Sequence, residues 1–113
     1  MKKLIISCDD LGISKEINLG IKDCLEKGVA TSSSLIANGQ FYNHALENVI
    51  NKTPQNYYGL HLNLTEGEAL NKIGENFICD DNNFFKISAK KYFLLNFYKK
   101  KKDFKNIIYN ELK

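Results

Sequence analysis

Hydrophobic positions along the chain change their spacing from one segment to the next, and these changes predict alternating strands and helices. Short continuous apolar runs are typical of buried strands, whereas apolar residues three or four positions apart are typical of amphipathic helices. The pattern predicts strands at 4–8, 29–39 and 57–67 and helices at 12–28 and 41–52. Ser14 is placed to cap the first helix and Gly28 to end it.

The order strand, helix, strand, helix, strand predicts an α/β fold with parallel strands, whose C-terminal ends meet at one edge of the sheet. Residues 68–87 show no clear period, and two more helices are predicted at 88–98 and 103–112. Three strands are few for a domain of this class. We therefore expect the 113 residues to be part of a longer protein.

The third predicted strand alternates between leucines and polar residues. The polar positions are His61, Asn63 and Thr65, and strict alternation places them on one face of the strand. The second predicted strand repeats the pattern with Ser32, Ser34 and Asn38. Parallel strands covered by helices on both faces are apolar throughout. The alternation therefore predicts a sheet with one polar face that lines a lumen or cleft.

Two adjacent carboxylates, Asp9 and Asp10, follow the first apolar run, and His61 lies near the end of the third strand. The shared C-terminal edge of parallel strands is where α/β folds bind ligands. Two carboxylates and an imidazole there suit a divalent metal ion with a carboxylate base beside it. Strict alternation sends the two aspartates to opposite faces, so we expect one of them to lie in a turn at Gly12.

Each of these residues has a plainer interpretation. An aspartate pair after a strand is commonly a turn or a helix cap, and a single strand histidine is commonly a hydrogen-bonding residue. His44, on the second predicted helix, is expected to be structural or exposed. The segment 79–83, "CDDNN", lacks the glycine and the terminal glutamate of a calcium-binding EF-hand loop, and we expect a turn there.

Charge and composition exclude several classes of protein. Residues 86–113 carry nine lysines and two acids, but the chain has no arginine, the residue best suited to phosphate and base contacts, so we expect no nucleic-acid partner. No apolar run reaches the roughly 18 residues of a membrane span, and we expect a cytoplasmic protein without a membrane partner. The three cysteines have no metal-site spacing and are expected to be reduced core thiols.

Three blocks, "LIISCDDLGISKEINLGI", "GVATSSSLIANG" and "YYGLHLNLTEGEAL", together resemble the YdjC-like carbohydrate deacetylases, which include the chitooligosaccharide deacetylases. The resemblance implies an irregular (β/α) barrel that binds a divalent metal ion, Mg²⁺ or Zn²⁺, and removes acetyl groups from N-acetylated oligosaccharides. It implies that Asp9 is the general base and that Asp10 and His61 are metal ligands. Thr65 and Glu66 belong to the same block without a direct role.

The chain departs from this family in its length. Family members are roughly twice as long and supply a further metal-binding histidine from a later, histidine-rich strand. The resemblance therefore implies that residues 1–113 are a single incomplete barrel domain, the N-terminal part of such an enzyme. We expect it to be inactive or incomplete alone.

Two alternatives remain open. The first is a truncated, non-catalytic remnant that acts as a binding module or forms a homo-oligomer to cover its sheet edge. The second is a phosphoacceptor receiver domain, which also has an acidic pair after its first strand. That domain needs an aspartate at the end of its third strand, where this chain has His61 and Glu66.

Overall fold

A computed structural model describes residues 2–71, 78–88 and 90–91 of the chain. Its elements are β1 (Ser7–Leu11), α1 (Lys15–Glu26), β2 (Ser32–Ile36), α2 (Tyr42–Ala45), the π-helical turn η1 (Leu46–Ile50) and β3 (Tyr57–His61). The contacts divide the chain into two compact units, Met1–Leu62 and Asn63–Lys113, and all six elements belong to the first. The helices predicted at 88–98 and 103–112 fall mainly outside the described residues.

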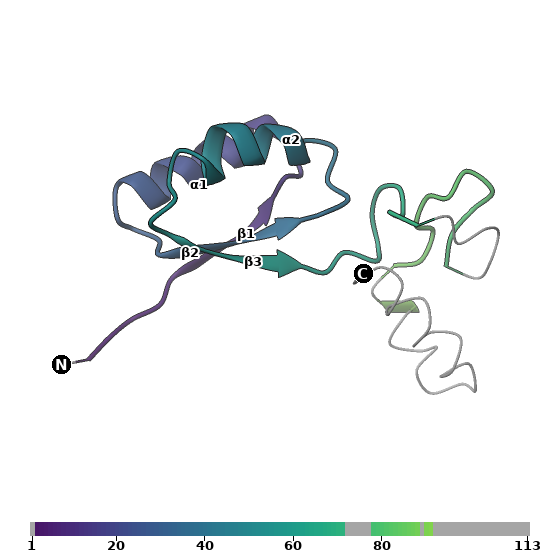
Figure 1. Cartoon of the computed structure of the whole chain (residues 1–113). Helices are drawn as coiled ribbons and strands as arrows, with labels where there is room; N and C mark the ends of the chain where they lie inside the picture. Colours follow the sequence, from purple (N-terminus) through teal and green to yellow (C-terminus); the bar gives the residue numbers. More distant parts are fainter. Residues whose placement is uncertain (1, 72–77, 89, 92–113) are drawn as a thin grey trace. The chain divides into compact units, whose positions relative to one another are not determined.

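The first unit is a three-stranded parallel sheet with its helices on one face (Figure 1). The strands follow one another in the order β1-β2-β3, so each helical connection joins neighbouring strands. The predicted α/β class with parallel strands is confirmed. A receiver-like sheet instead places its first strand between the second and the third. The observed order, with β2 in the centre, is incompatible with that alternative.

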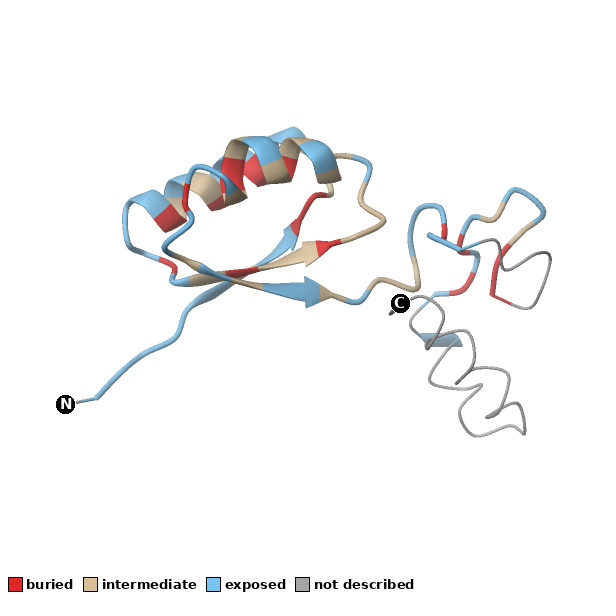
Figure 2. Cartoon of the chain, in the orientation of Figure 1, coloured by how far each residue is buried: buried red, intermediate tan, exposed pale blue. Residues whose placement is uncertain are grey.

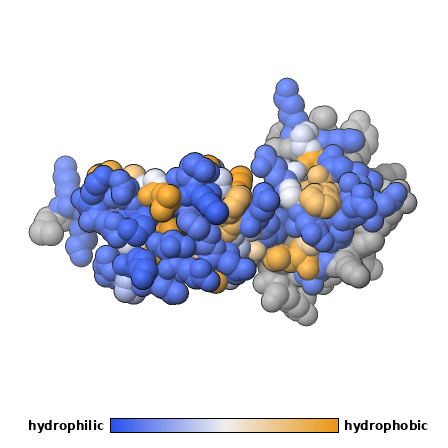
Figure 3. All heavy atoms as spheres, turned by 90° about the horizontal axis from the view of Figure 1, so that it is seen from above, coloured by the Kyte–Doolittle hydropathy of each residue, from blue (hydrophilic) through white to orange (hydrophobic). Residues whose placement is uncertain are grey.

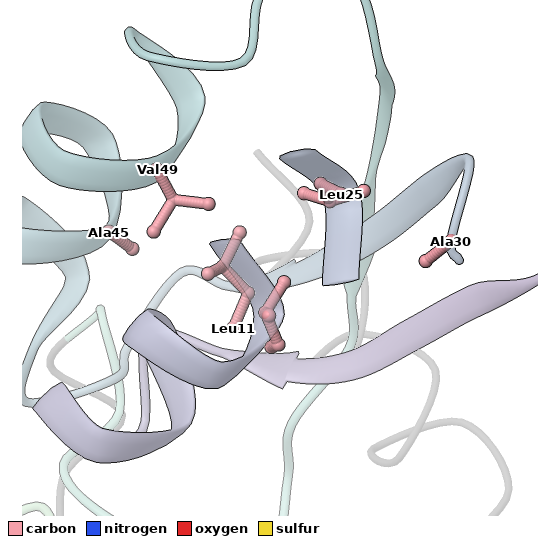
Figure 4. Close-up of a cluster of buried hydrophobic side chains, with 6 residues drawn as sticks. Leu11, Leu25, Ala30, Ala45 and Val49 are labelled. Atoms are coloured by element: carbon pink, nitrogen blue, oxygen red, sulfur yellow. The ribbon is translucent and has the colours of Figure 1, made fainter. Parts of the chain in front are cut away.

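The core of this unit lies between the helices and the sheet (Figure 4). Its buried members are Leu11, Ile21, Leu25, Ala30, Ala45 and Val49. Figure 2 shows the buried residues gathered where the helices face the sheet, with β2 more buried than β1 and β3. Seen from the helix side, the surface of the unit is mainly hydrophilic, as expected for amphipathic helices with one face on a sheet (Figure 3).

Both ends of α1 match the prediction. The Ser14 hydroxyl accepts a hydrogen bond from the Ile17 amide at 3.2 Å, and the helix ends at Glu26. Gly28 follows with φ of 71°, in the left-handed region that ends many helices. The second predicted helix divides into α2 and η1, and none of the described helices is long and apolar enough to cross a membrane.

The first strand was predicted three residues too early. It was expected at 4–8, but β1 is Ser7–Leu11, and Leu4 and Ile5 are 78% and 79% exposed. Pairing with the neighbouring segment begins at the Ile6 carbonyl, which accepts a hydrogen bond from the Thr31 amide at 2.9 Å. Residues 4–6 of the apolar run therefore precede the sheet, and the strand continues through the two aspartates.

The other two strands are shorter than predicted. β2 ends at Ile36, so Asn38 lies beyond it, and β3 ends at His61. Beyond β3, the Asn63 side chain accepts hydrogen bonds from the amides of Thr65 and Glu66 at 3.1 and 3.2 Å, which turns the chain. This local competition for backbone donors ends the extended conformation.

The leucines of the third predicted segment do not form one buried face. Leu60 and Leu62 are 55% and 43% exposed. Leu64 packs against the core of the second unit. The predicted alternation therefore holds only as far as His61, the last residue of β3.

The second unit has a small core of its own, made of Ala69, Ile78, Cys79, Phe85 and Ile87. Antiparallel bridges join Glu68 to Phe84 and Cys79 to Phe85. Between them the Asp80 carboxylate accepts hydrogen bonds from the amides of Asn82 and Phe84 at 3.0 and 2.9 Å. The predicted turn at 79–83 is confirmed.

We expect Ser14→Ala to lower the free energy of unfolding by about 1 kcal/mol, because an amide at the start of α1 loses its acceptor. Ser14→Asp should retain most of the stability, since a carboxylate also caps a helix and favours its N-terminus. Urea denaturation followed by circular dichroism measures both variants. Equal stability of the alanine variant and the native chain would contradict the assigned cap.

Candidate functional site

A β-bulge in β1 sets the geometry of the candidate site. Cys8 pairs with Ser33 and Leu11 pairs with Leu35, so Asp9 and Asp10 together oppose the single residue Ser34. Asp10 has φ of 67°, a left-handed conformation that aspartate tolerates better than most residues. The expectation that one aspartate lies in the turn is therefore wrong. Both belong to the strand, and the extra residue cancels the alternation that would send them to opposite faces.

The bulge places the Asp10 carboxylate beside His61 and the Asp9 carboxylate beside Ser34, which also contacts His61. The Ser34 hydroxyl donates a hydrogen bond to Asp9 Oδ1 at 2.8 Å. His61 Nδ1 lies 3.5 Å from Asp10 Oδ1 and 3.4 Å from Ser34 Oγ. His61 and Asp10 are 33% and 53% exposed, so water and solutes reach the cluster. The structure thus brings together the three candidate residues, and it adds Ser34.

His61 Nδ1 has three polar neighbours. The Asp10 amide nitrogen and Ser34 Oγ each lie 3.4 Å from it, and Asp10 Oδ1 lies 3.5 Å from it. The single hydroxyl proton of Ser34 is used in the shorter bond to Asp9. His61 Nδ1 therefore faces the cluster, beside a carboxylate oxygen of Asp10.

This pair of donors fits a divalent metal ion. One carboxylate oxygen and one imidazole nitrogen are standard ligands for Zn²⁺, with bonds of about 2.0 to 2.2 Å. Two such ligands at a tetrahedral angle lie about 3.4 Å apart, and the observed separation of Asp10 Oδ1 and His61 Nδ1 is 3.5 Å. Across residues 2–71, 78–88 and 90–91, however, no three His, Cys, Asp or Glu side chains form a group that could hold a metal ion. The described part of the chain offers two ligands.

A buried asparagine holds the backbone directly after the bulge. Asn18 is 0% exposed, and its Oδ1 accepts a hydrogen bond from the Gly12 amide at 2.7 Å. Its amide nitrogen donates to the Phe41 carbonyl at 3.2 Å and lies 3.1 Å from His44 Nδ1. Phe41 in turn donates to the Gly12 carbonyl at 2.9 Å. These bonds tie β1, α1 and the start of α2 together, and His44 has the structural role expected of it.

Gly12 and Gly39 make this junction possible. Gly12 has φ of 101°, and a Cβ at Gly39 would lie 2.3 Å from the Gly12 carbonyl oxygen. A side chain at Gly39 would therefore displace the loop that follows the aspartates. Sequence analysis missed both Asn18 and Ser34 as site residues. A polar residue on the apolar side of the first helix was the available signal for Asn18.

The remaining candidate residues have the following local surroundings. Thr65 and Glu66 belong to the second unit, where Asn63 binds their amides. Cys8 and Cys24 are half-buried against the core, and Cys79 is buried. Burial, with the neighbouring Cys24 thiol, raises the pKa of Cys8. The prediction of reduced core thiols agrees with these positions.

Comparison with known proteins identifies relatives along most of the chain. The family model described as YdjC-like protein matches residues 3–113. A carbohydrate deacetylase of Clostridium beijerinckii is 38% identical over 84 residues, which cover 74% of this chain and 34% of that protein. Carbohydrate deacetylase 2 of Listeria innocua is 40% identical over 84 residues, with 74% and 33% covered.

A chitooligosaccharide deacetylase of Klebsiella pneumoniae is 40% identical over 67 residues, which cover 59% of this chain and 26% of that protein. In each comparison the matched segment is about a third or less of the relative. The chain thus spans only a part of the length of the curated relatives it matches.

We expect Asn18→Ala to destabilise the first unit by about 1 to 3 kcal/mol, because the buried Gly12 amide loses its acceptor. Asn48→Ala is the matched control, since the Asn48 amide group donates a single bond to the His44 carbonyl. Its cost should stay below about 1 kcal/mol. Urea denaturation measures both, and equal costs would contradict the role given to Asn18.

Proposed function

The chain belongs to the YdjC-like family, and on that premise we propose that it takes part in metal-dependent deacetylation of N-acetylated carbohydrates. The observation that carries the proposal is the bulge in β1, which turns Asp9 and Asp10 to the same side as His61. The reaction is hydrolysis of an amide: water adds to the acetyl carbon, the C–N bond breaks, and acetate and a free amino sugar are released.

We further propose that the three strands are the first part of an irregular (β/α) barrel. A complete doubly wound sheet reverses its strand order after the first three strands and then has helices on both faces, whereas a barrel continues in chain order with helices on one face throughout. Here the strands run in chain order with the helices of the unit on one face (Figure 1). A barrel has this arrangement, with the other face turned to its interior. Asp9, Ser34 and His61 then belong to the interior side of the wall.

Asp10 Oδ1 and His61 Nδ1 would hold the divalent ion, Mg²⁺ or Zn²⁺. When bound, such an ion polarises the acetyl carbonyl and makes a bound water more acidic. The chain's own contribution is to present one oxygen and one nitrogen donor 3.5 Å apart at a solvent-accessible edge. With two ligands from the described residues, further ligands come from water or from residues beyond them.

Asp9 is the proposed general base. One of its carboxylate oxygens is held by the Ser34 hydroxyl, which leaves the other free to accept a proton from the attacking water. The same oxygen can return that proton to the amine nitrogen as the C–N bond breaks. The division of work between neighbouring aspartates thus follows from their different partners, Ser34 for Asp9 and His61 for Asp10.

A non-catalytic module is the second candidate. The observation in its favour is that the described residues supply only two metal ligands, Asp10 and His61. β1 and β3 are both outer strands of the sheet, and Leu60 on β3 is 55% exposed. Pairing of such edges between two copies would give a homo-oligomer.

Measurements of metal affinity test whether Asp10 and His61 are the ligands. We expect Asp10→Ala and His61→Ala each to weaken Mn²⁺ binding by about tenfold or more, because each removes one of two ligands. Mn²⁺ is chosen because it prefers oxygen donors, whereas Zn²⁺ would also bind the cysteine thiols. Electron paramagnetic resonance of free Mn²⁺ measures the affinity, and His44→Ala is the matched control. Unchanged affinity in both ligand variants would refute the proposed site.

Acetate release tests the reaction itself. Although the resemblance led us to expect an inactive or incomplete chain, the proposed function predicts that the chain, loaded with Mn²⁺ and incubated with di-N-acetylchitobiose, releases acetate. Asp9→Asn should abolish the release while Mn²⁺ still binds. The substitution keeps the shape of Asp9 but removes its capacity to accept a proton. No acetate from the native chain, together with a dimer in analytical ultracentrifugation, would favour the non-catalytic module instead.

A further inference from the structure

Three consecutive serines on β2 donate hydrogen bonds to β1 or to Ile6, the residue directly before it, and the three acceptors differ. Ser32 Oγ donates to the Ile6 carbonyl at 3.5 Å and Ser33 Oγ to the Cys8 carbonyl at 2.8 Å. Ser34 Oγ donates to a side chain, the Asp9 carboxylate, at 2.8 Å. Two of the serines therefore bind backbone, whereas the third fixes the position of a carboxylate in the candidate site.

Ser34 also contacts both parts of that site. Its oxygen is 3.4 Å from His61 Nδ1 and 2.8 Å from Asp9 Oδ1. The bulge makes Ser34 the one residue of β2 opposite both aspartates. A half-buried hydroxyl with its proton committed to Asp9 thus contacts both that carboxylate and His61 Nδ1.

We propose that Ser34 is a positioning residue that keeps Asp9 from becoming a metal ligand. This inference rests on the proposed function, in which Asp10 and His61 hold the ion. A carboxylate beside a divalent cation is itself a good ligand, and one that ligates the ion has less capacity to act as a base. The hydrogen bond to Ser34 holds Asp9 Oδ1 and thereby opposes its rotation toward the ion.

The inference predicts an increase in affinity when a hydrogen bond is removed. In Ser34→Ala the Asp9 carboxylate is free to turn and add a third ligand, so Mn²⁺ should bind about fivefold more tightly, the equilibrium equivalent of one ordinary hydrogen bond. A hydroxyl with a merely structural role predicts weaker binding, since its loss would loosen the site. Ser34→Thr retains the hydroxyl on a strand and should retain the native affinity.

The experiment measures Mn²⁺ affinity by electron paramagnetic resonance in the full chain. Ser32→Ala is the matched control, because Ser32 lies on the same face of β2 and bonds only to backbone. In an Asp9→Ala background, Ser34→Ala should no longer change the affinity. Circular dichroism and urea denaturation establish that each variant is folded before it is titrated.

The inference is supported if Ser34→Ala binds Mn²⁺ more tightly than the native chain and Ser32→Ala does not. The gain must also disappear when Ser34→Ala is made in the Asp9→Ala background. Unchanged or weaker binding in Ser34→Ala overturns it, as does the same gain in the Asp9→Ala background. A native chain that binds no Mn²⁺ overturns the proposed metal site and the role of Ser34 with it. If Mn²⁺ binding by the native chain depends on Asp10 and His61 but not on Ser34, the role of Ser34 is overturned while the proposed metal site stands.

Discussion

The bulge in β1 is the constraint on which the candidate site depends. Side chains of a regular strand alternate between its faces, so neighbouring aspartates would be separated by the sheet. Placing Asp9 and Asp10 opposite one residue, Ser34, removes that separation at the cost of a left-handed conformation at Asp10. Such a conformation persists only where surrounding bonds hold it. Here the buried Asn18 side chain accepts a hydrogen bond from the amide of Gly12, two residues after Asp10.

The same arrangement gives two chemically equal side chains unequal surroundings. Asp9 is bound by a hydroxyl, whereas Asp10 lies beside an imidazole nitrogen. Both carboxylates are exposed, so water reduces their mutual repulsion in the absence of an ion. A divalent cation beside Asp10 would offset that repulsion further. Position along the chain does not distinguish the two aspartates, but their hydrogen-bonding partners do.

Much of this structure follows from the sequence, and the failures have identifiable physical causes. Helix ends were predictable because Ser14 and Gly28 act within one turn of α1. The location of the aspartates and His61 at one edge of the sheet was predictable, because the C-terminal ends of parallel strands meet there. The start of β1 was not predictable, because the exposed Leu4 and Ile5 resemble a buried strand in composition. The bulge was missed for a related reason. The alternation rule assumes that each residue of a strand pairs with one residue of the neighbouring strand, and no local sequence signal marks the extra residue in β1.

The account's central claim is that the bulge makes Asp10 a metal ligand and leaves Asp9 free as a base. A crystal of the chain soaked in Mn²⁺ and measured at the manganese absorption edge tests this directly. The account predicts an anomalous peak bonded to Asp10 and His61, with Asp9 still bound to Ser34. A peak elsewhere, or one with Asp9 among the ligands, would contradict it.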